Sequence, residues 1–109
     1  MLKQIIENNT NLKQAEVVAL CKWKGNLAAI PCSNAMSGYY PDYKKSIVIK
    51  ENIEDLYGDI EALLLIKPTK NWDEYEVVFA TDSWDGFQPA LIEDINDIVE
   101  FIKWLALYI

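Results

Sequence analysis

Two neighbouring segments near the start of the chain, residues 16–24 and residues 27–32, are largely apolar, with Glu16, Lys22 and Lys24 as the polar exceptions. Short apolar segments bounded by turn-forming residues are typical of β-strands. The pair Gly25-Asn26 separates the two segments, and glycine supplies the positive φ that a tight hairpin turn needs. We therefore predict a β-hairpin with a two-residue turn at Gly25-Asn26.

The predicted register divides the side chains of this hairpin between two faces. The face expected to point into the core carries Val17, Ala19, Cys21, Trp23, Ala28, Ile30 and Cys32. Because Cys21 lies opposite Ile30 in this register, the two cysteines are diagonal neighbours. Diagonal neighbours lie about 7–8 Å apart, which is beyond the usual Cα separation in a disulfide. We expect two reduced, buried thiols.

Three further segments are predicted to be strands. Residues 46–50 are a short apolar segment, and residues 60–67 are apolar on both faces, as expected of a central strand. Residues 74–81 show the most regular alternation in the chain. Between these strands we expect a loop at residues 33–45, which is rich in tyrosine and turn-forming residues, and a short helix at residues 51–57.

Helices are predicted at both ends of the chain. Residues 2–14 form a short helix interrupted by the polar residues 8–11, and residues 89–108 form a longer one, because proline suits a first helical turn. The apolar stripe of the longer helix is expected at Leu91, Ile95, Ile98, Ile102 and Leu105. The sequence thus predicts a single α+β domain of residues 1–109, with a mainly antiparallel sheet of about five strands and the C-terminal helix packed on it.

Charge is divided unevenly along the chain. Residues 1–50 hold seven lysines and three acids, net +4, whereas residues 51–109 hold three lysines and fourteen acids, net −11, which sums to −7. There is no arginine and no histidine. A strongly negative surface repels nucleic acids and phosphorylated ligands, and it speeds the encounter with a basic partner.

No catalytic or metal-binding motif is recognisable. Without histidine, the most common general acid or base at neutral pH is missing, and Ser or Cys nucleophiles have no imidazole to activate them. The segment that begins at Asp82 resembles the start of a calcium loop, but Trp84 and Gly86 occupy its third and fifth positions, where oxygen ligands are required. We expect a protein that is not an enzyme and that has no metal or cofactor.

A role in binding nucleic acid is disfavoured as well. A basic patch could form beside Tyr39, Tyr40 and Tyr43 from Lys22, Lys24, Lys44, Lys45 and Lys50. Lysines interleaved with aromatics can follow a single strand, but a solvated surface is the better interpretation, because no guanidinium group is available for bidentate phosphate or base recognition.

The sequence also predicts no association with membranes. The N-terminus lacks the apolar stretch of a signal peptide. The longest nearly apolar run, residues 104–109, is far shorter than the roughly 18 residues that suggest a membrane span. We expect a cytoplasmic protein.

Two segments that we expect to be exposed loops combine aromatic side chains with carboxylates. They contribute Trp72, Asp73, Glu74 and Glu76 from the first segment, and Asp82, Trp84, Asp85 and Phe87 from the second. At an interface, Trp supplies hot-spot area, while carboxylates steer and orient a basic partner. The aromatics are either exposed anchors or plugs that fold inward. We predict that these residues bind a basic protein, with Trp72 or Trp84 as the anchor.

In size, charge and aromatic content the chain resembles the small acidic immunity proteins of bacterial toxin–immunity systems, including those of contact-dependent inhibition. The resemblance implies a cytoplasmic single domain that binds and blocks a cognate toxin, often a basic nuclease. It rests on general character, and such proteins differ widely in fold, so it assigns no site residue. The alternatives are another protein-interaction module or a nucleic-acid mimic of the phage-inhibitor type. A small carboxylate-dependent enzyme or a ligand-binding domain is less favoured.

Overall fold

The computed structural model describes residues 1–109 except residues 1, 36, 57, 69–71 and 73. In chain order the elements are α1 (Leu2–Glu7), α2 (Thr10–Gln14), β1 (Val17–Trp23), β2 (Asn26–Ala35), β3 (Gly38–Pro41), η1 (Tyr43–Lys45), β4 (Ile47–Lys50), β5 (Ala62–Ile66), β6 (Glu76–Ser83), β7 (Gly86–Pro89), η2 (Ile92–Asp94) and α3 (Ile95–Ala106). The fold is therefore α+β, as predicted.

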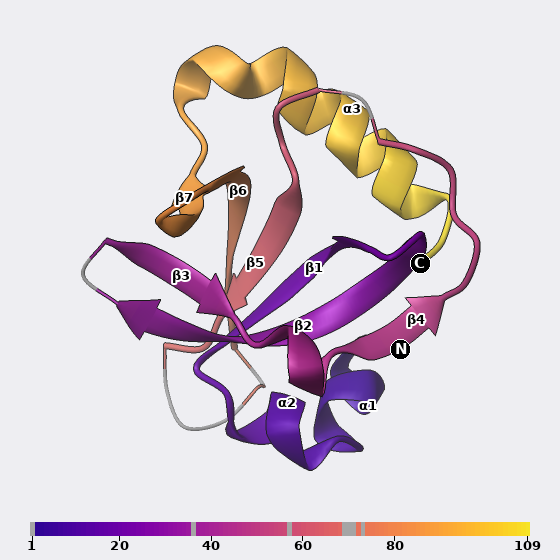
Figure 1. The fold of residues 1–109 in the computed structure, drawn as a ribbon, viewed down its shortest axis with the longest axis vertical. Coiled ribbons are helices and arrows are strands. Elements are labelled where there is room, and N and C mark those ends of the chain that lie inside the picture. The colour runs from indigo at the N-terminus through magenta and orange to yellow at the C-terminus, as the bar shows by residue number, and fades with distance from the viewer. Residues whose placement is uncertain (1, 36, 57, 69–71, 73) are drawn as a thin grey trace.

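The strands form one antiparallel sheet that closes on itself (Figure 1). Within the described residues, the six strands of the closed part follow the order β1-β5-β6-β7-β3-β2, and β2 pairs with β1 to complete the barrel. The seventh strand, β4, pairs with the first part of β2 and extends the sheet outside the barrel. The prediction of about five strands was too low.

The barrel interior is lined by unusually small side chains. Its buried cluster consists of Val17, Ala19, Cys21, Ala28, Ile30, Cys32, Ala62, Leu64, Ala80 and Phe87. An eight-stranded barrel is just wide enough for ordinary side chains to fill its interior. Because six strands enclose a narrower space, the alanines and cysteines allow the barrel to close without overpacking.

Helices cover two sides of the barrel from outside (Figure 1). Ile6 of α1 and Leu12 of α2 pack against the outward side chains of β1, β2 and β5. Phe101 and Trp104 of α3 pack in a second outer cluster with Leu27 of β2 and two residues that precede β5. The central strands are therefore buried on both faces. None of the described helices is long and apolar enough to cross a membrane.

The first hairpin forms with a register two residues away from the predicted one. The turn lies at Lys24-Gly25, where both residues have positive φ, 52° and 77°. Cys21 therefore pairs with Ala28, and Cys32 pairs with Val17. A shift of two residues preserves the face of every side chain, so the predicted core face is confirmed. Cys21 and Cys32 are buried free thiols, as expected, although they are not diagonal neighbours.

Two short strands that the sequence analysis placed in loops close the barrel. The predicted loop at residues 33–45 contains the end of β2 and all of β3, and the segment expected to link β6 to the last helix is a hairpin leading into β7. β3 meets β7 at the pair Tyr39 and Phe87. Gly86, with φ of 90°, lies so close to β3 in this pairing that a Cβ atom added to it would lie 2.7 Å from the Tyr39 carbonyl oxygen.

The predicted helices were wrong in two places. The described residues of segment 51–57 are not helical. The last helix begins at Ile95, later than predicted, because Pro89 ends β7. Its buried face is also rotated from the expected stripe: Phe101 and Trp104 are buried, whereas Leu91, Ile95 and Ile102 are exposed. Of the predicted stripe, Ile98 and Leu105 are partly buried and pack in the same cluster as Phe101 and Trp104. Apolar side chains occupy two adjacent arcs of α3, and the sequence pattern does not show which arc faces the barrel.

Candidate functional site

The residues predicted to bind a partner do not form one site. Glu74 and Glu76 lie before and at the start of β6, whereas Asp82 lies near its end. At about 3.4 Å per residue, the six steps from Glu76 to Asp82 span roughly 20 Å. All three side chains are exposed, but they lie at opposite ends of the barrel. Asp73 lies outside the described residues.

Trp72 is a buried plug and not an exposed anchor. It packs in the outer cluster with Ile6, Leu12 and Leu65. Its indole Nε1 donates a hydrogen bond to the backbone carbonyl of Lys13 at 3.0 Å. This bond satisfies the only polar atom of the indole, so the ring can be buried under α2 at little polar cost.

Phe87 is also buried, in the interior of the barrel. Its position follows from the hairpin that the sequence analysis missed. Asp82 pairs with Phe87 across the β6–β7 hairpin, and Tyr39 pairs with Phe87 from the other side. An aromatic side chain on a strand of a closed barrel points inward or outward by its place in the alternation, and Phe87 points inward.

Trp84 is the exposed aromatic of the predicted set. It lies in the turn between β6 and β7 with 93% of its surface exposed. The turn is held by two hydrogen bonds: the Ser83 hydroxyl donates to the Gly86 carbonyl at 3.0 Å, and the Asp85 backbone N–H donates to the Ser83 Oγ at 3.3 Å. The exposed indole therefore stands on an ordered turn, directly before Asp85 and two residues after Asp82 in the chain.

A cavity of about 520 Å³ opens at the same end of the barrel. Its lining residues are Cys21, Lys22, Trp23, Tyr43, Asp55, Leu56, Gly58, Ile60, Glu61, Asp82 and Phe87. Cys21, Ile60 and Phe87 are buried, whereas Glu61 and Asp82 are exposed. The cavity therefore has an apolar interior and acidic side chains where it meets solvent. Cavities of this size at barrel mouths commonly bind ligands.

An aromatic pair forms part of the cavity wall. The rings of Trp23 and Tyr43 stack with centroids 3.9 Å apart and planes inclined by 20°. Trp23 ends β1, and Tyr43 begins η1, which follows β3. The ammonium group of Lys24 lies 5.6 Å from the Trp23 ring centroid, so this lysine of the predicted basic patch is directed to the aromatic pair.

The charges around the cavity are unbalanced. The Lys22 ammonium pairs with the Asp55 carboxylate, which leaves Glu61 and Asp82 without an ion-pair partner among the described residues. Partial burial, reinforced by the Asp82 charge, raises the pKa of Glu61, although the Asp82 backbone N–H donates a hydrogen bond that opposes this shift. Burial, together with the charge of Asp82, raises the pKa of Tyr43 to about 12.

The charges of Asp82 and Glu61 also act on the Cys21 thiol, which lines the cavity. Burial raises the pKa of Cys21 to about 12, with further contributions from Cys32, Asp82 and Glu61. Burial likewise raises the pKa of Cys32 to about 12, and its Sγ donates to the Ile30 carbonyl at 3.4 Å. Neither thiol is therefore a nucleophile at neutral pH.

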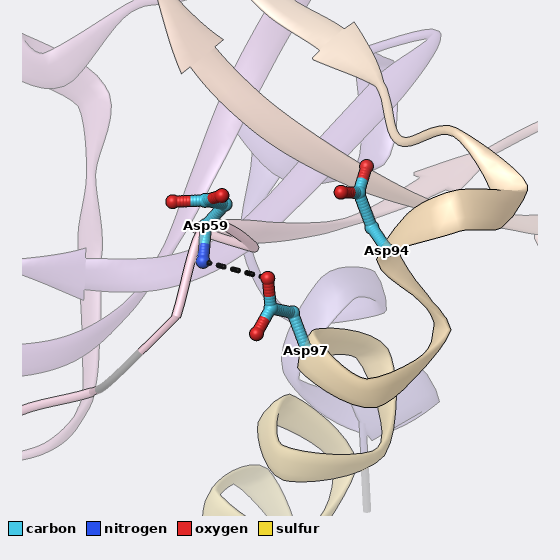
Figure 2. Close-up of side chains that lie close together, drawn as sticks. All are labelled: Asp59, Asp94 and Asp97. Carbon is cyan, nitrogen blue, oxygen red and sulfur yellow. Dashed lines mark hydrogen bonds between the residues drawn. The ribbon is translucent and has the colours of Figure 1, made fainter.

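Three carboxylates gather beside α3, as Figure 2 shows. Oxygen atoms of Asp59, Asp94 and Asp97 all lie within 4.8 Å of one another. Backbone N–H groups already engage two of them: Asp59 donates to Asp97 Oδ2 at 3.4 Å, and Leu91 donates to Asp94 Oδ2 at 3.0 Å. Carboxylate oxygens are the ligands that Ca²⁺ and Mg²⁺ prefer, but the cluster by itself does not identify a metal site. Its negative charge adds to that of the cavity, since Asp59 also raises the pKa of Glu61.

The sequence pattern thus indicated one side of this end of the barrel and not the other. It found Asp82, Trp84 and Asp85 through the combination of aromatics and acids in one segment. It did not connect them with Trp23, Tyr43 or Glu61, which come from distant parts of the chain. The Glu61 backbone N–H donates to the Ala80 carbonyl at 2.9 Å, so the pairing of β5 with β6 is what brings Glu61 next to Asp82.

Comparison of the chain with protein-family models, with curated proteins and with solved structures finds no significant match.

Proposed function

We propose that this protein binds and neutralises a basic protein in the cytoplasm, in the manner of a small immunity protein, and that it acts by binding and not by catalysis. The proposed surface is the β6–β7 end of the barrel, with Trp84 as anchor and Asp82 and Asp85 beside it. The observation that carries the proposal is the position of Trp84, because a side chain with 93% of its surface exposed on an ordered turn leaves a large apolar area uncovered.

The charge of the protein supports the same surface. The net charge is −7, and it includes Glu61 and Asp82, two carboxylates at this end of the barrel that have no ion-pair partner in the part of the chain that the structure describes. Tryptophan is strongly enriched among the residues that dominate binding energy, and acidic side chains around it accelerate association with a basic partner. A basic partner would gain both from burial of the indole and from neutralisation of this end of the barrel.

The experiment is to recover the partner from the native host and to measure its binding kinetics with variants of this protein. Trp84→Ala is expected to raise the dissociation rate at least tenfold, since a hot-spot truncation costs about 2 kcal/mol or more. Asp82→Asn and Asp85→Asn are expected to lower the association rate and to weaken its dependence on salt, because added ions screen charges over about 10 Å at 0.1 M.

Glu76→Gln is the matched control, since it removes the same charge from the other end of the strand that carries Asp82. It is expected to change the association rate much less. Equal effects of Glu76→Gln and Asp82→Asn, or an unchanged dissociation rate for Trp84→Ala, would place the interface elsewhere. If the partner's activity persists in the saturated complex, the protein binds but does not neutralise, and the immunity assignment is wrong.

A further inference from the structure

We propose that the cavity at the mouth of the barrel is a binding site for an organic cation, an alkylammonium or alkylguanidinium group. The site would hold the charged head between Glu61 and Asp82 and the alkyl stem against Trp23 and Tyr43. This proposal goes beyond partner binding through Trp84, which does not line the cavity.

The charge of the lining selects a cation. The lining contains one lysine, Lys22, and three acids, Asp55, Glu61 and Asp82, so its net charge is −2. The lysine is already paired with Asp55, so the remaining negative charge lies on Glu61 and Asp82. The pKa of each of the neighbouring groups Tyr43, Cys21 and Glu61 is raised in part by this charge. A bound cation would offset the repulsion between the Glu61 and Asp82 carboxylates, whereas the Tyr43 hydroxyl and the Cys21 thiol are neutral at pH 7.

The walls select an organic cation over a metal ion or a neutral ligand. Hard cations require several oxygen ligands, whereas much of this lining consists of stacked aromatic rings, aliphatic side chains and the Cys21 thiol. A neutral apolar ligand would cover the carboxylates without pairing them, which is unfavourable. An alkyl cation meets both requirements, because its head can donate hydrogen bonds to carboxylates while its stem packs on aromatic rings.

The size of the cavity fits such a group. Its volume of about 520 Å³ lies within the range of about 300–1,000 Å³ that is typical of small-molecule sites. The buried floor formed by Cys21, Ile60 and Phe87 offers the stem an apolar end. Part of the lining comes from the ends of β1, β6 and β7, which the closed barrel holds in place, so this part of the site is present before the ligand binds. The rest comes from η1 and from residues 55, 56, 58, 60 and 61, which precede β5.

The test is a titration of the isotopically labelled protein at pH 7 with n-butylguanidinium, followed by amide chemical shifts. The neutral analogue n-butylurea, which has nearly the same shape, is the matched control. Saturable shifts confined to the cavity residues Cys21, Glu61 and Asp82 are expected for the guanidinium, with none for the urea. Equal shifts for both compounds, shifts without saturation, or shifts centred on Asp94 and Asp97 would overturn the proposal.

Variants then assign the binding to the two carboxylates. Glu61→Gln and Asp82→Asn are each expected to weaken n-butylguanidinium binding about tenfold, the effect of losing one charge-assisted hydrogen bond. Glu76→Gln, which removes an exposed acid from the far end of β6, is expected to leave the affinity unchanged. Unchanged binding in Glu61→Gln and Asp82→Asn alike would overturn the proposal, since both side chains are exposed and their replacement leaves the fold intact.

Two sources could supply the cation: the side chain of a protein partner and a free amine. A parallel titration with N-acetyl-arginine amide, in which the guanidinium is attached to a peptide-like backbone, distinguishes them. If N-acetyl-arginine amide binds as tightly as n-butylguanidinium, the cavity is a site for the side chain of a protein partner. Binding of n-butylguanidinium alone identifies a site for a free organic cation. If neither compound binds, the proposed cation site is wrong. If Trp84→Ala does not change partner binding, the proposed partner surface is wrong, but the cation site is unaffected.

Discussion

Replacement of Phe101 by alanine removes the most deeply packed aromatic ring between α3 and the barrel. Phe101 is 0% exposed, and its ring lies 6.1 Å from that of Phe79 in an edge-to-face arrangement and 5.5 Å from that of Trp104. Truncation of a buried Phe to Ala typically lowers the free energy of unfolding by about 3–5 kcal/mol. We expect a loss of about 3–5 kcal/mol for Phe101→Ala as well, because the barrel and α3 can shift only partly to fill the cavity that the ring leaves.

Ile102→Ala is the matched control, one residue further along the same helix. Full burial of an Ile side chain contributes about 1.5–3 kcal/mol, and Ile102 is 49% exposed. Truncation therefore removes roughly half of that contribution, about 1 kcal/mol, and the higher helix propensity of alanine returns up to about 0.5 kcal/mol. The net loss expected for Ile102→Ala is about 0.5 kcal/mol.

The assay is urea unfolding followed by far-UV circular dichroism, with the slope of free energy against urea compared between variants to confirm that unfolding remains two-state. If Ile102→Ala proves as destabilising as Phe101→Ala, the orientation of α3 described above is wrong. The helix would then be rotated towards the stripe that the sequence pattern favoured.

Three further outcomes concern the barrel interior, the contact between β3 and β7, and the exposed carboxylate of Glu61 at the cavity. Cys21 and Cys32, whose pKa values are raised to about 12 by burial, should react with a thiol reagent at pH 8 far more slowly than free cysteine, and two thiols should titrate after denaturation without reductant; fewer than two would show a disulfide. Gly86→Ala should lower the free energy of unfolding by more than about 2 kcal/mol, because it combines a positive φ with a backbone clash. Gly25 has a similar φ, but no atom lies within 4 Å of the Cβ that Gly25→Ala would add. An equal loss of stability in the two variants would show that the close approach of Gly86 to Tyr39 is not what makes Gly86→Ala destabilising. Glu61 has a raised pKa in the folded protein, so its contribution to stability is present below its unfolded pKa and is lost as the pH rises through its folded pKa. Because Glu61 is exposed and solvent screens its charge, Glu61→Gln should raise stability only slightly at pH 7 and should flatten the pH dependence above the unfolded pKa; a loss at pH 7 would contradict this reasoning.

The face assignment of the first hairpin could be predicted, because successive side chains of a strand point to opposite faces and an error of two in the register leaves each side chain on the same face. The predicted turn was wrong for a local reason. Lys24 adopts positive φ, which a lysine rarely does, so the dipeptide Gly25-Asn26 gave the more conventional signal. The strands β1, β2, β4, β5 and β6 were all recognised from pattern alone.

The elements that the sequence did not reveal are those whose structure depends on closure of the barrel. β3 and β7 are four residues each, contain glycine and proline, and pair with each other through Tyr39 and Phe87. Such short segments carry no periodic signal of their own. Long-range pairing creates them, and the same pairing turns Phe87 inward.

The candidate site was only half predictable for a related reason. The proximity of Asp82, Trp84 and Asp85 in sequence survives folding because they share one turn. Trp72 also looked like an exposed anchor, but whether a loop tryptophan is exposed depends on the space beneath it. Here α2 offers both an apolar contact and the Lys13 carbonyl, and neither is visible from the local sequence.

The central claim, that the β6–β7 end of the barrel binds a basic protein, is tested most directly by amide hydrogen exchange in the complex with the partner recovered from the host. The account predicts slower exchange on binding at residues 82–87 and at residues 58–61 beside the cavity, with no change at residues 74–77 at the other end of β6. Protection at residues 74–77 or along α3, with residues 82–87 unaffected, would contradict it.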